Sequence, residues 1–186
     1  KNGLQPVDNP SEIFISQGRR ISAGSTIISC MEGTRALLVE IQALVARANF
    51  GMPERKVSGV DYNRVSMLLA ILEKRIGLKL GGQDIFVNIV GGVQIDEPAA
   101  DLGIAMTIAS SFKEKVIPSD IVFVGEVGLG GEVRSVSQIE IRLKEAQRLG
   151  FKRAVIPKDN AKGIGKELGI ERIEVCYLSE AVEIIG

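Results

Sequence analysis

The order of the hydrophobic patterns constrains the fold of this chain more than any other feature. Two runs rich in β-branched residues flank Glu32-Gly33-Thr34 within residues 25–45, which predicts a long β-hairpin. Strand-like and helix-like runs then alternate in the C-terminal half, at 84–90, 98–112, 120–127, 137–150, 153–157, 161–169, 173–178 and 179–185. Hairpins followed by this alternation predict a mixed-sheet α/β or α+β domain.

The segment between these halves contains one loop-like and one helix-like stretch. Residues 46–59 mix Gly, Pro and charge without periodicity, which predicts an exposed loop. Asp61 can cap a helix that ends at Gly77. Its apolar face is formed by Val65, Leu68, Leu69, Leu72 and Ile76, and we expect Arg64, Lys74 and Arg75 to be solvated.

Composition excludes several kinds of chemistry. The 186 residues contain no histidine, which rules out Ser-His-Asp and Cys-His nucleophile systems and the commonest transition-metal ligand. No apolar run approaches the roughly 20 residues of a membrane span, and no signal peptide is visible, so we expect no membrane association and a cytoplasmic location. We interpret Cys30 and Cys176 as reduced core thiols. The chain begins at Lys1, which suggests a fragment of a longer protein.

Charge is balanced overall but unevenly distributed. Residues 51–83 carry six basic and three acidic groups, residues 84–132 carry two and eight, and residues 133–166 carry nine and three. Two basic segments therefore flank an acidic one, a pattern compatible with a binding face or with ordinary surface charge.

The glycine clusters do not have the spacing of a phosphate loop, because Val133 takes the last glycine of G-x-G-x-x-G. The stretch IDEPAADLGIAM, residues 95–106, has a plain interpretation as a helix start, with Pro98 in the first turn and acids near the positive end of the helix dipole. Acid-base work by Asp96 and Glu97 is the weaker interpretation, since adjacent residues seldom converge on one substrate atom.

Residues 91–112 and 122–157 resemble the proteolytic domain of Lon proteases in motif and in element order. The resemblance places Ala99 where Lon has its nucleophilic serine and Glu140 where Lon has its partner lysine. A methyl group cannot attack a carbonyl, so peptidase chemistry is predicted to be lost. Ser110 and Ser111 lie roughly 16 Å further along the helix at 1.5 Å per residue, and we interpret them as helix-end or surface residues.

More of the chain, from about Asn9 to Asn160, resembles the C-terminal Lon-like domain of the RadA (Sms) family of bacterial DNA-repair proteins. The phrases that carry this resemblance are NPSEIF, MEGTRALLVEIQALV, FGMPERKVSGVDYNRVSMLLAILEKRIGL, DEPAADL, IASSF and GEVGLGGEVR. It implies that residues 1–186 form a single Lon-like domain with a mixed-sheet α/β (α+β) fold, of the ribosomal protein S5 domain 2-like type.

The resemblance further implies a role in recombinational repair. The parent family joins such a domain to a zinc finger and a RecA-like ATPase, forms hexameric rings and promotes branch migration. We therefore expect no catalytic site and no cofactor in this chain, with ATP, magnesium and zinc bound by the missing domains. The expected partners are single-stranded or branched DNA, further copies of the chain in a homo-hexamer, and recombination proteins of the RecA type.

The basic segments supply candidate DNA contacts, because guanidinium groups can form bidentate hydrogen bonds with phosphate. Weak contacts that are repeated around a ring increase the overall affinity. The candidates are Arg55, Lys56, Arg64, Arg134, Arg142 and Lys144. Arg64 has a second interpretation, as a partner of Asp61 on the same helix.

Two other functions stay open. One is a surviving Ser-Lys peptidase, which the identities of Ala99 and Glu140 argue against. The other is a pure assembly module, whose signature would be Arg55, Lys56, Arg64 or Arg142 buried against the acidic segment of a neighbouring chain.

Overall fold

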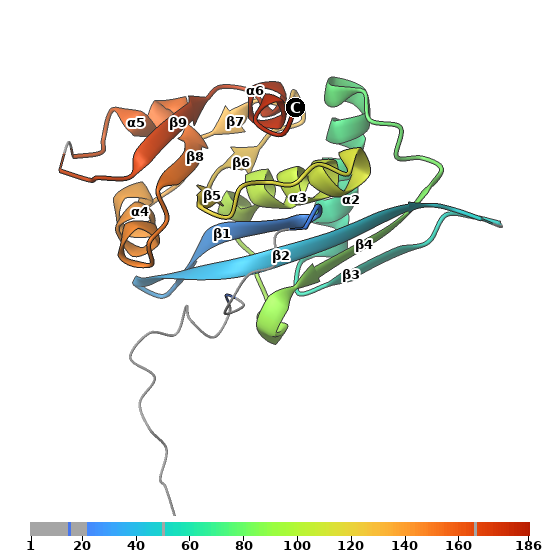
Figure 1. Ribbon diagram of the computed structural model, residues 1–186, viewed down its shortest axis with the longest axis horizontal. Coiled ribbons are helices and arrows are strands. Elements are labelled where there is room, and N and C mark those ends of the chain that lie inside the picture. Colours follow the sequence, from blue (N-terminus) through green and yellow to red (C-terminus); the bar gives the residue numbers. More distant parts are fainter. Residues whose placement is uncertain (1–14, 16–21, 50, 166) are drawn as a thin grey trace, which may run out of the picture.

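The computed structural model describes residues 15, 22–49, 51–165 and 167–186 (Figure 1). The phrase NPSEIF, at residues 9–14, lies outside the described residues. The strands are β1 (Ser25–Glu32), β2 (Arg35–Arg47), β3 (Arg55–Ser58), β4 (Gln83–Ile89), β5 (Ile121–Phe123), β6 (Glu126–Val127), β7 (Val133–Arg134), β8 (Arg153–Pro157) and β9 (Glu171–Val175). The α-helices are α2 (Tyr62–Ile71), α3 (Asp101–Lys113), α4 (Ile139–Arg148), α5 (Lys158–Ala161) and α6 (Leu178–Glu183). Shorter helical turns are η1 (Leu72–Ile76, π-helical), η2 (Val90–Gly92) and η3 (Pro98–Ala100, 3₁₀).

A seven-stranded mixed sheet in the order β3-β4-β2-β1-β5-β8-β9 forms the centre of the fold, and β6 pairs with β7 in a separate hairpin. The predicted hairpin β1–β2 is confirmed, with Glu32 opposite Arg35 and Gly33 in the turn at a φ of 59°, which glycine adopts without strain. The strands β5, β8 and β9 pair in parallel, as their helical connections require. The predicted mixed-sheet α/β fold class is therefore confirmed.

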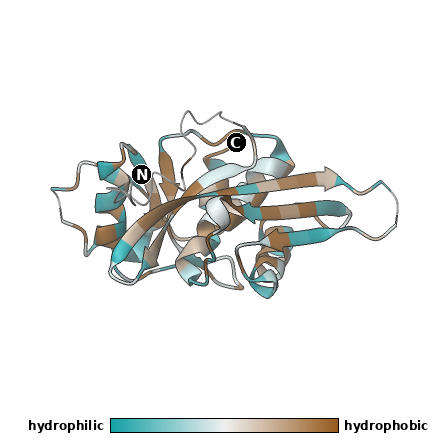
Figure 2. Ribbon diagram, turned by 90° about the horizontal axis from the view of Figure 1, so that it is seen from below, coloured by the Kyte–Doolittle hydropathy of each residue, from teal (hydrophilic) through white to brown (hydrophobic). Residues whose placement is uncertain are grey.

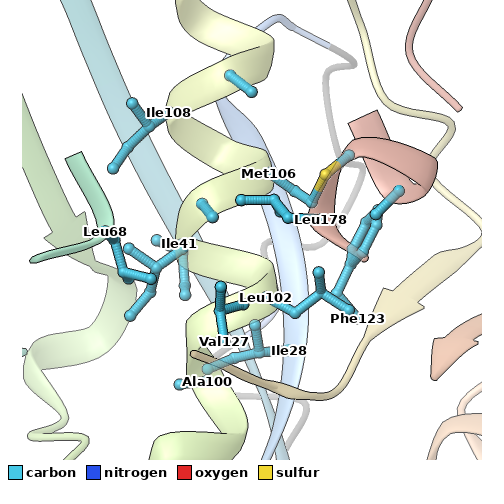
Figure 3. Close-up of a cluster of buried hydrophobic side chains, with 14 of the residues drawn as sticks. Ile28, Ile41, Leu68, Ala100, Leu102, Met106, Ile108, Phe123, Val127 and Leu178 are labelled. Atoms are coloured by element: carbon cyan, nitrogen blue, oxygen red, sulfur yellow. The ribbon is translucent and has the colours of Figure 1, made fainter. Parts of the chain in front are cut away.

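Helices cover both faces of this sheet because successive strand residues point to opposite sides. Ile28 faces a cluster that includes residues of α2, α3 and α6, whereas Ile27 faces a cluster that includes residues of α4. Figure 3 shows α3 with Leu102, Met106 and Ile108 pointing into the first cluster. Figure 2 shows hydrophobic residues along the strands of the sheet and hydrophilic residues at many of its turns.

Three predicted elements differ from the structure. Residues 46–59 are not wholly loop, because they contain the end of β2 and all of β3, which pairs in parallel with β4. The predicted strand 120–127 is divided into β5 and β6, since the Gly125 N–H donates to Ala99 O at 3.0 Å instead of to a strand. The helix predicted at 161–169 is wrong where the structure describes it: α5 ends at Ala161 and turn residues follow.

Several predicted side-chain environments also need correction. Ser110 and Ser111 end α3 as predicted but are buried rather than surface residues; their hydroxyls accept from Gly24 N–H and Val45 N–H, each at 2.9 Å. Both cysteines are free thiols, but only Cys30 is buried, while Cys176 is partly exposed. Within the described ranges, no helix combines the length and apolar character needed to cross a bilayer.

The cap of α2 is confirmed and is directly testable. Asp61 Oδ1 accepts from the Arg64 backbone N–H at 2.8 Å. We expect Asp61→Ala to lower the free energy of unfolding by about 0.5–2 kcal/mol, because this N–H loses its acceptor. Urea unfolding measures the change, and Asp61→Asn is the control because its amide oxygen can still accept. Equal losses in both variants would contradict the role of the cap.

Candidate functional site

The two positions that the sequence resemblance assigns to the Lon dyad, Ala99 and Glu140, lie where the start of α3 meets α4. Ala99, in η3, is 3% exposed and belongs to the same buried cluster as Ile139 and Leu143 of α4. Glu140, in the first turn of α4, accepts from Gly165 N–H at 3.3 Å and lies 4.0 Å from Lys144 Nζ. A buried methyl group and a carboxylate with these partners form no nucleophile and no base of the Ser-Lys kind.

A buried ion pair occupies the same junction. Arg142 is 1% exposed, and its Nη1 and Nη2 donate to Glu97 Oε1 and Oε2 at 2.8 and 2.7 Å. Arg142 also donates to Ser29 O at 2.7 Å and to Ser137 O at 3.0 Å. Glu97 Oε1 in turn accepts from Met31 N–H at 2.7 Å. One bidentate pair therefore ties β1, the segment before η3 and α4 together.

This network overturns one sequence-based expectation. Arg142 was a candidate DNA contact, but its guanidinium is buried and its donors face protein acceptors, so it is not available to a phosphate here.

Nearby, burial raises the pKa of the Cys30 thiol to about 12, and the Glu97 carboxylate acts in the same direction. Cys30 is therefore an inert core thiol at neutral pH.

A second ion pair joins α2 to α3. Arg64 Nε donates to Asp101 Oδ1, and Arg64 Nη2 donates to Asp101 Oδ2 at 2.7 Å. Val127 N–H also donates to Asp101 Oδ2, at 3.2 Å. Burial raises the pKa of the Asp101 carboxyl, and the hydrogen bonds from Arg64 and Val127 act against that rise. Arg64 thus pairs with Asp101, and Asp61, the partner considered from the sequence, instead caps the helix.

The Arg64–Asp101 pair forms one wall of an open cavity of about 390 Å³ between α2 and the β6–β7 hairpin. Its apolar lining includes Leu68 and Val127. Arg134, another DNA candidate, lines the same cavity and is exposed, and Glu126 and Glu132 add negative charge there. The cavity therefore mixes both signs of charge and is not a basic cleft.

The other basic candidates lie elsewhere. Arg55 and Lys56 are on β3, at the edge of the sheet, and Lys56 Nζ pairs with Glu54 at 2.7 Å. Lys144 is on α4, which packs on the opposite face of the sheet from α2. Lys144 and Arg35 both line a hollow of about 290 Å³ between the β1–β2 turn and α4. The structure thus brings Arg64 and Arg134 together but does not gather all six candidates into one patch. No metal-binding group of three or more His, Cys, Asp or Glu occurs among the described residues.

Sequence reasoning missed two features of this region. It weighed Glu97 only beside Asp96 and did not connect it with Arg142, which is 45 residues away in the chain. It also did not single out Arg35, which lines the same hollow as Lys144. Both arrangements depend on how α4 packs against the β1–β2 hairpin, and no local pattern encodes that packing.

Comparison with known proteins gives two results. Residues 41–160, more than half of the chain, match the family described as subunit ChlI of Mg-chelatase. Proteins named DNA repair protein RadA also match nearly the whole chain. The one from Bacillus subtilis is 53% identical over 182 residues, 98% of this chain and 40% of the relative.

Two further relatives carry the same name. The protein from Listeria monocytogenes is 51% identical over 181 residues, covering 97% of this chain and 40% of the relative. The protein from Synechocystis is 44% identical over 184 residues, covering 99% of this chain and 36% of the relative. The chain therefore belongs to the family described as subunit ChlI of Mg-chelatase and is homologous to a region spanning about 40% of proteins named DNA repair protein RadA.

Proposed function

We propose that this chain is the non-proteolytic Lon-like domain of a RadA-type DNA repair and recombination ATPase. The observation that carries the proposal is the 53% identity to a DNA repair protein RadA across 98% of the chain. In this proposal residues 1–186 form a single domain of a longer cytoplasmic protein. Its other parts supply the zinc finger, the ATPase core and the sites for ATP, magnesium and zinc.

The loss of proteolysis is supported by the junction between α3 and α4. Ala99 has no nucleophilic atom, and the carboxylate of Glu140 cannot take the part of a lysine. The adjacent Arg142–Glu97 pair holds this junction together by charge-assisted hydrogen bonds. The geometry therefore favours a structural role for the region in which Lon proteases cut peptides.

The proposed activity of the domain is ring assembly and DNA contact during branch migration, beside recombination proteins of the RecA type. The exposed candidates for phosphate contact are Arg134, Lys144 and Lys56, with the partly exposed Arg55. Phosphate contacts of this kind carry no sequence information, and their binding weakens as salt rises. Copies arranged in a ring would repeat each contact and strengthen a weak one.

A second candidate function is a scaffold for assembly without DNA contact. It is favoured by the distribution of the basic residues, because Arg55 and Lys56 lie on an edge strand and Lys144 lies on α4. The chain also has a formal net charge of +0 at pH 7. Zero net charge gives little long-range attraction between a single copy and DNA.

Fluorescence-anisotropy titration with single-stranded and branched DNA across a salt series distinguishes these functions. We expect binding that weakens with salt, and we expect Arg134→Ala to reduce the slope of log affinity against log salt by about 1 per bound chain. Lys115→Ala is the charge-matched control, since Lys115 is exposed and lies outside the candidate set. If the chain assembles but does not bind DNA even at low salt, DNA contact is contradicted and the scaffold function is favoured.

A further inference from the structure

The cavity between α2 and the β6–β7 hairpin contains charged side chains of both signs that do not pair with each other. Glu126 lies opposite Arg134 in the register of the hairpin, and both line the cavity together with Glu132. Within the described ranges, none of these three side chains forms an ion pair. Glu126 and Glu132 are half-buried, whereas Arg134 is exposed at the mouth. The cavity therefore holds charges that a ligand can still pair with.

The glycines of the hairpin allow the Glu132 carboxylate to lie against the turn. A Cβ at either Gly128 or Gly130 would overlap that carboxylate, and both glycines line the cavity. A side chain at either position would push the carboxylate aside. The backbone of the turn thus leaves room for a second acceptor beside Glu126.

The charges around the cavity balance. The ion pair that joins α2 to α3 in its wall is neutral in itself. The carboxylates of Glu126 and Glu132 are matched by the guanidinium groups of Arg134 and of Arg75, whose Nε donates to Leu129 O at the tip of the hairpin. A neutral site of this kind selects neither a polyanion nor a polycation. It suits a ligand that carries one charge of each sign.

The remaining wall of the cavity is apolar. Met67, Leu68 and Ile71 contribute from α2, and Val127 and Leu129 contribute from the hairpin. Met67 is 48% exposed and Leu129 is 70% exposed, so an apolar ligand would cover surface that now faces water. The volume of about 390 Å³ lies within the range of small-molecule sites. The ligand that fits this lining has an aliphatic body as well as two opposite charges.

We propose that this cavity binds a free α-amino acid with an aliphatic side chain, such as leucine. Its ammonium group faces Glu126 and Glu132, its carboxylate faces Arg134, and its side chain packs against Leu68 and Met67. An ammonium group has three donors for the two acidic residues, and a guanidinium can bind a carboxylate with two hydrogen bonds. Directly opposite strand residues have Cβ atoms about 4.5–5.5 Å apart. An α-amino acid can bridge two such residues because its ammonium and carboxylate groups are attached to one carbon.

Isothermal titration calorimetry with L-leucine and three analogues tests each contact separately. N-acetyl-leucine lacks the ammonium group, leucinamide lacks the carboxylate, and alanine lacks the aliphatic body. We expect leucine to bind at one site per chain and each analogue to bind at least about tenfold more weakly, because each analogue leaves one part of the cavity without its partner. Leucine should also raise the midpoint of thermal unfolding more than any analogue at the same concentration.

Two variants connect the contacts with their residues. Arg134→Gln should weaken leucine binding by about tenfold or more and leave leucinamide binding unchanged, because the variant and the analogue remove the same contact. Glu126→Gln should likewise weaken the binding of leucine and not that of N-acetyl-leucine. Lys115→Gln is the matched control, since Lys115 is exposed and lies outside the cavity lining. The unfolding midpoint without ligand shows whether each variant is folded.

The possible results are distinct. If the folded wild type does not bind leucine, the proposal is overturned. Equal affinities for leucine and leucinamide, or leucine binding that survives both substitutions, would overturn the recognition of a zwitterion in this cavity. The site does not rest on the proposed function, because DNA binding is measured separately and either result can stand without the other.

Discussion

Arg142→Ala is expected to lower the free energy of unfolding by about 3–5 kcal/mol, because it leaves Glu97 without its charge partner in a largely buried position. The guanidinium is 1% exposed and bridges Glu97, Ser29 O and Ser137 O. Loss of the side chain therefore removes the tie between β1 and α4 as well as the ion pair. Urea unfolding followed by circular dichroism measures the change.

Two further variants show whether charge pairing causes this loss. Lys56→Ala also breaks an ion pair, but Lys56 is 67% exposed, so we expect a loss of at most about 1 kcal/mol. In Arg142→Met with Glu97→Met, both charges are replaced by apolar groups, so no unpaired charge remains and the loss should be smaller than in Arg142→Ala. A loss below about 1 kcal/mol in Arg142→Ala would contradict the structural role of the pair.

Gly103→Ala is expected to destabilise the chain by about 1–3 kcal/mol, although alanine is the better helix former by roughly 1 kcal/mol. A Cβ at Gly103 would overlap Ile28 Cγ2, where α3 packs against β1. The same backbone position accepts hydrogen bonds from Thr26 and Thr107 through its carbonyl, so α3 has little freedom to move away. Thermal and urea unfolding both report the change.

A double-mutant cycle identifies the source of this effect. Ile28→Ala removes the methyl group that a Cβ at position 103 would meet, so the double variant should be more stable than the sum of the single losses predicts, by about 0.5–3 kcal/mol. Gly82→Ala is the control, since nothing lies within 4 Å of a Cβ at Gly82. Additive losses in the cycle would mean that Ile28 is not the obstacle.

Local patterns predicted the elements whose partners are near in sequence. The β1–β2 hairpin follows from two β-branched runs around Gly33, and α2 follows from its Asp61 cap and its apolar spacing. The strand β3 was predicted as loop because it has a single apolar side chain, Val57, and gains its structure from pairing with β4. An edge strand of this kind has no pattern of its own to detect.

The candidate site was less predictable, for the same reason. Arg142 is buried because its guanidinium binds Glu97 and Ser29, which lie on two other parts of the chain. The sequence of a helix does not show whether an arginine on it is buried or exposed. Arg64 shows the same limit: its local partner Asp61 was considered, but the residue that binds its guanidinium is Asp101, 37 residues away. Tertiary packing determines which polar residues distant in sequence form pairs, and hydrophobic periodicity does not predict that packing.

The place of β1 in the sheet has a consequence for synthesis on the ribosome. β1 lies between β2 and β5, and Ile27 pairs with Val122. A nascent chain that has released β1 and β2 therefore displays an unpaired strand edge until β5, at Ile121–Phe123, has emerged, and unpaired edges invite aggregation. The β1–β2 hairpin can form early, but its β1 edge is paired only after α2, β4 and α3 have also been made, and slow folding is expected from such distant pairing.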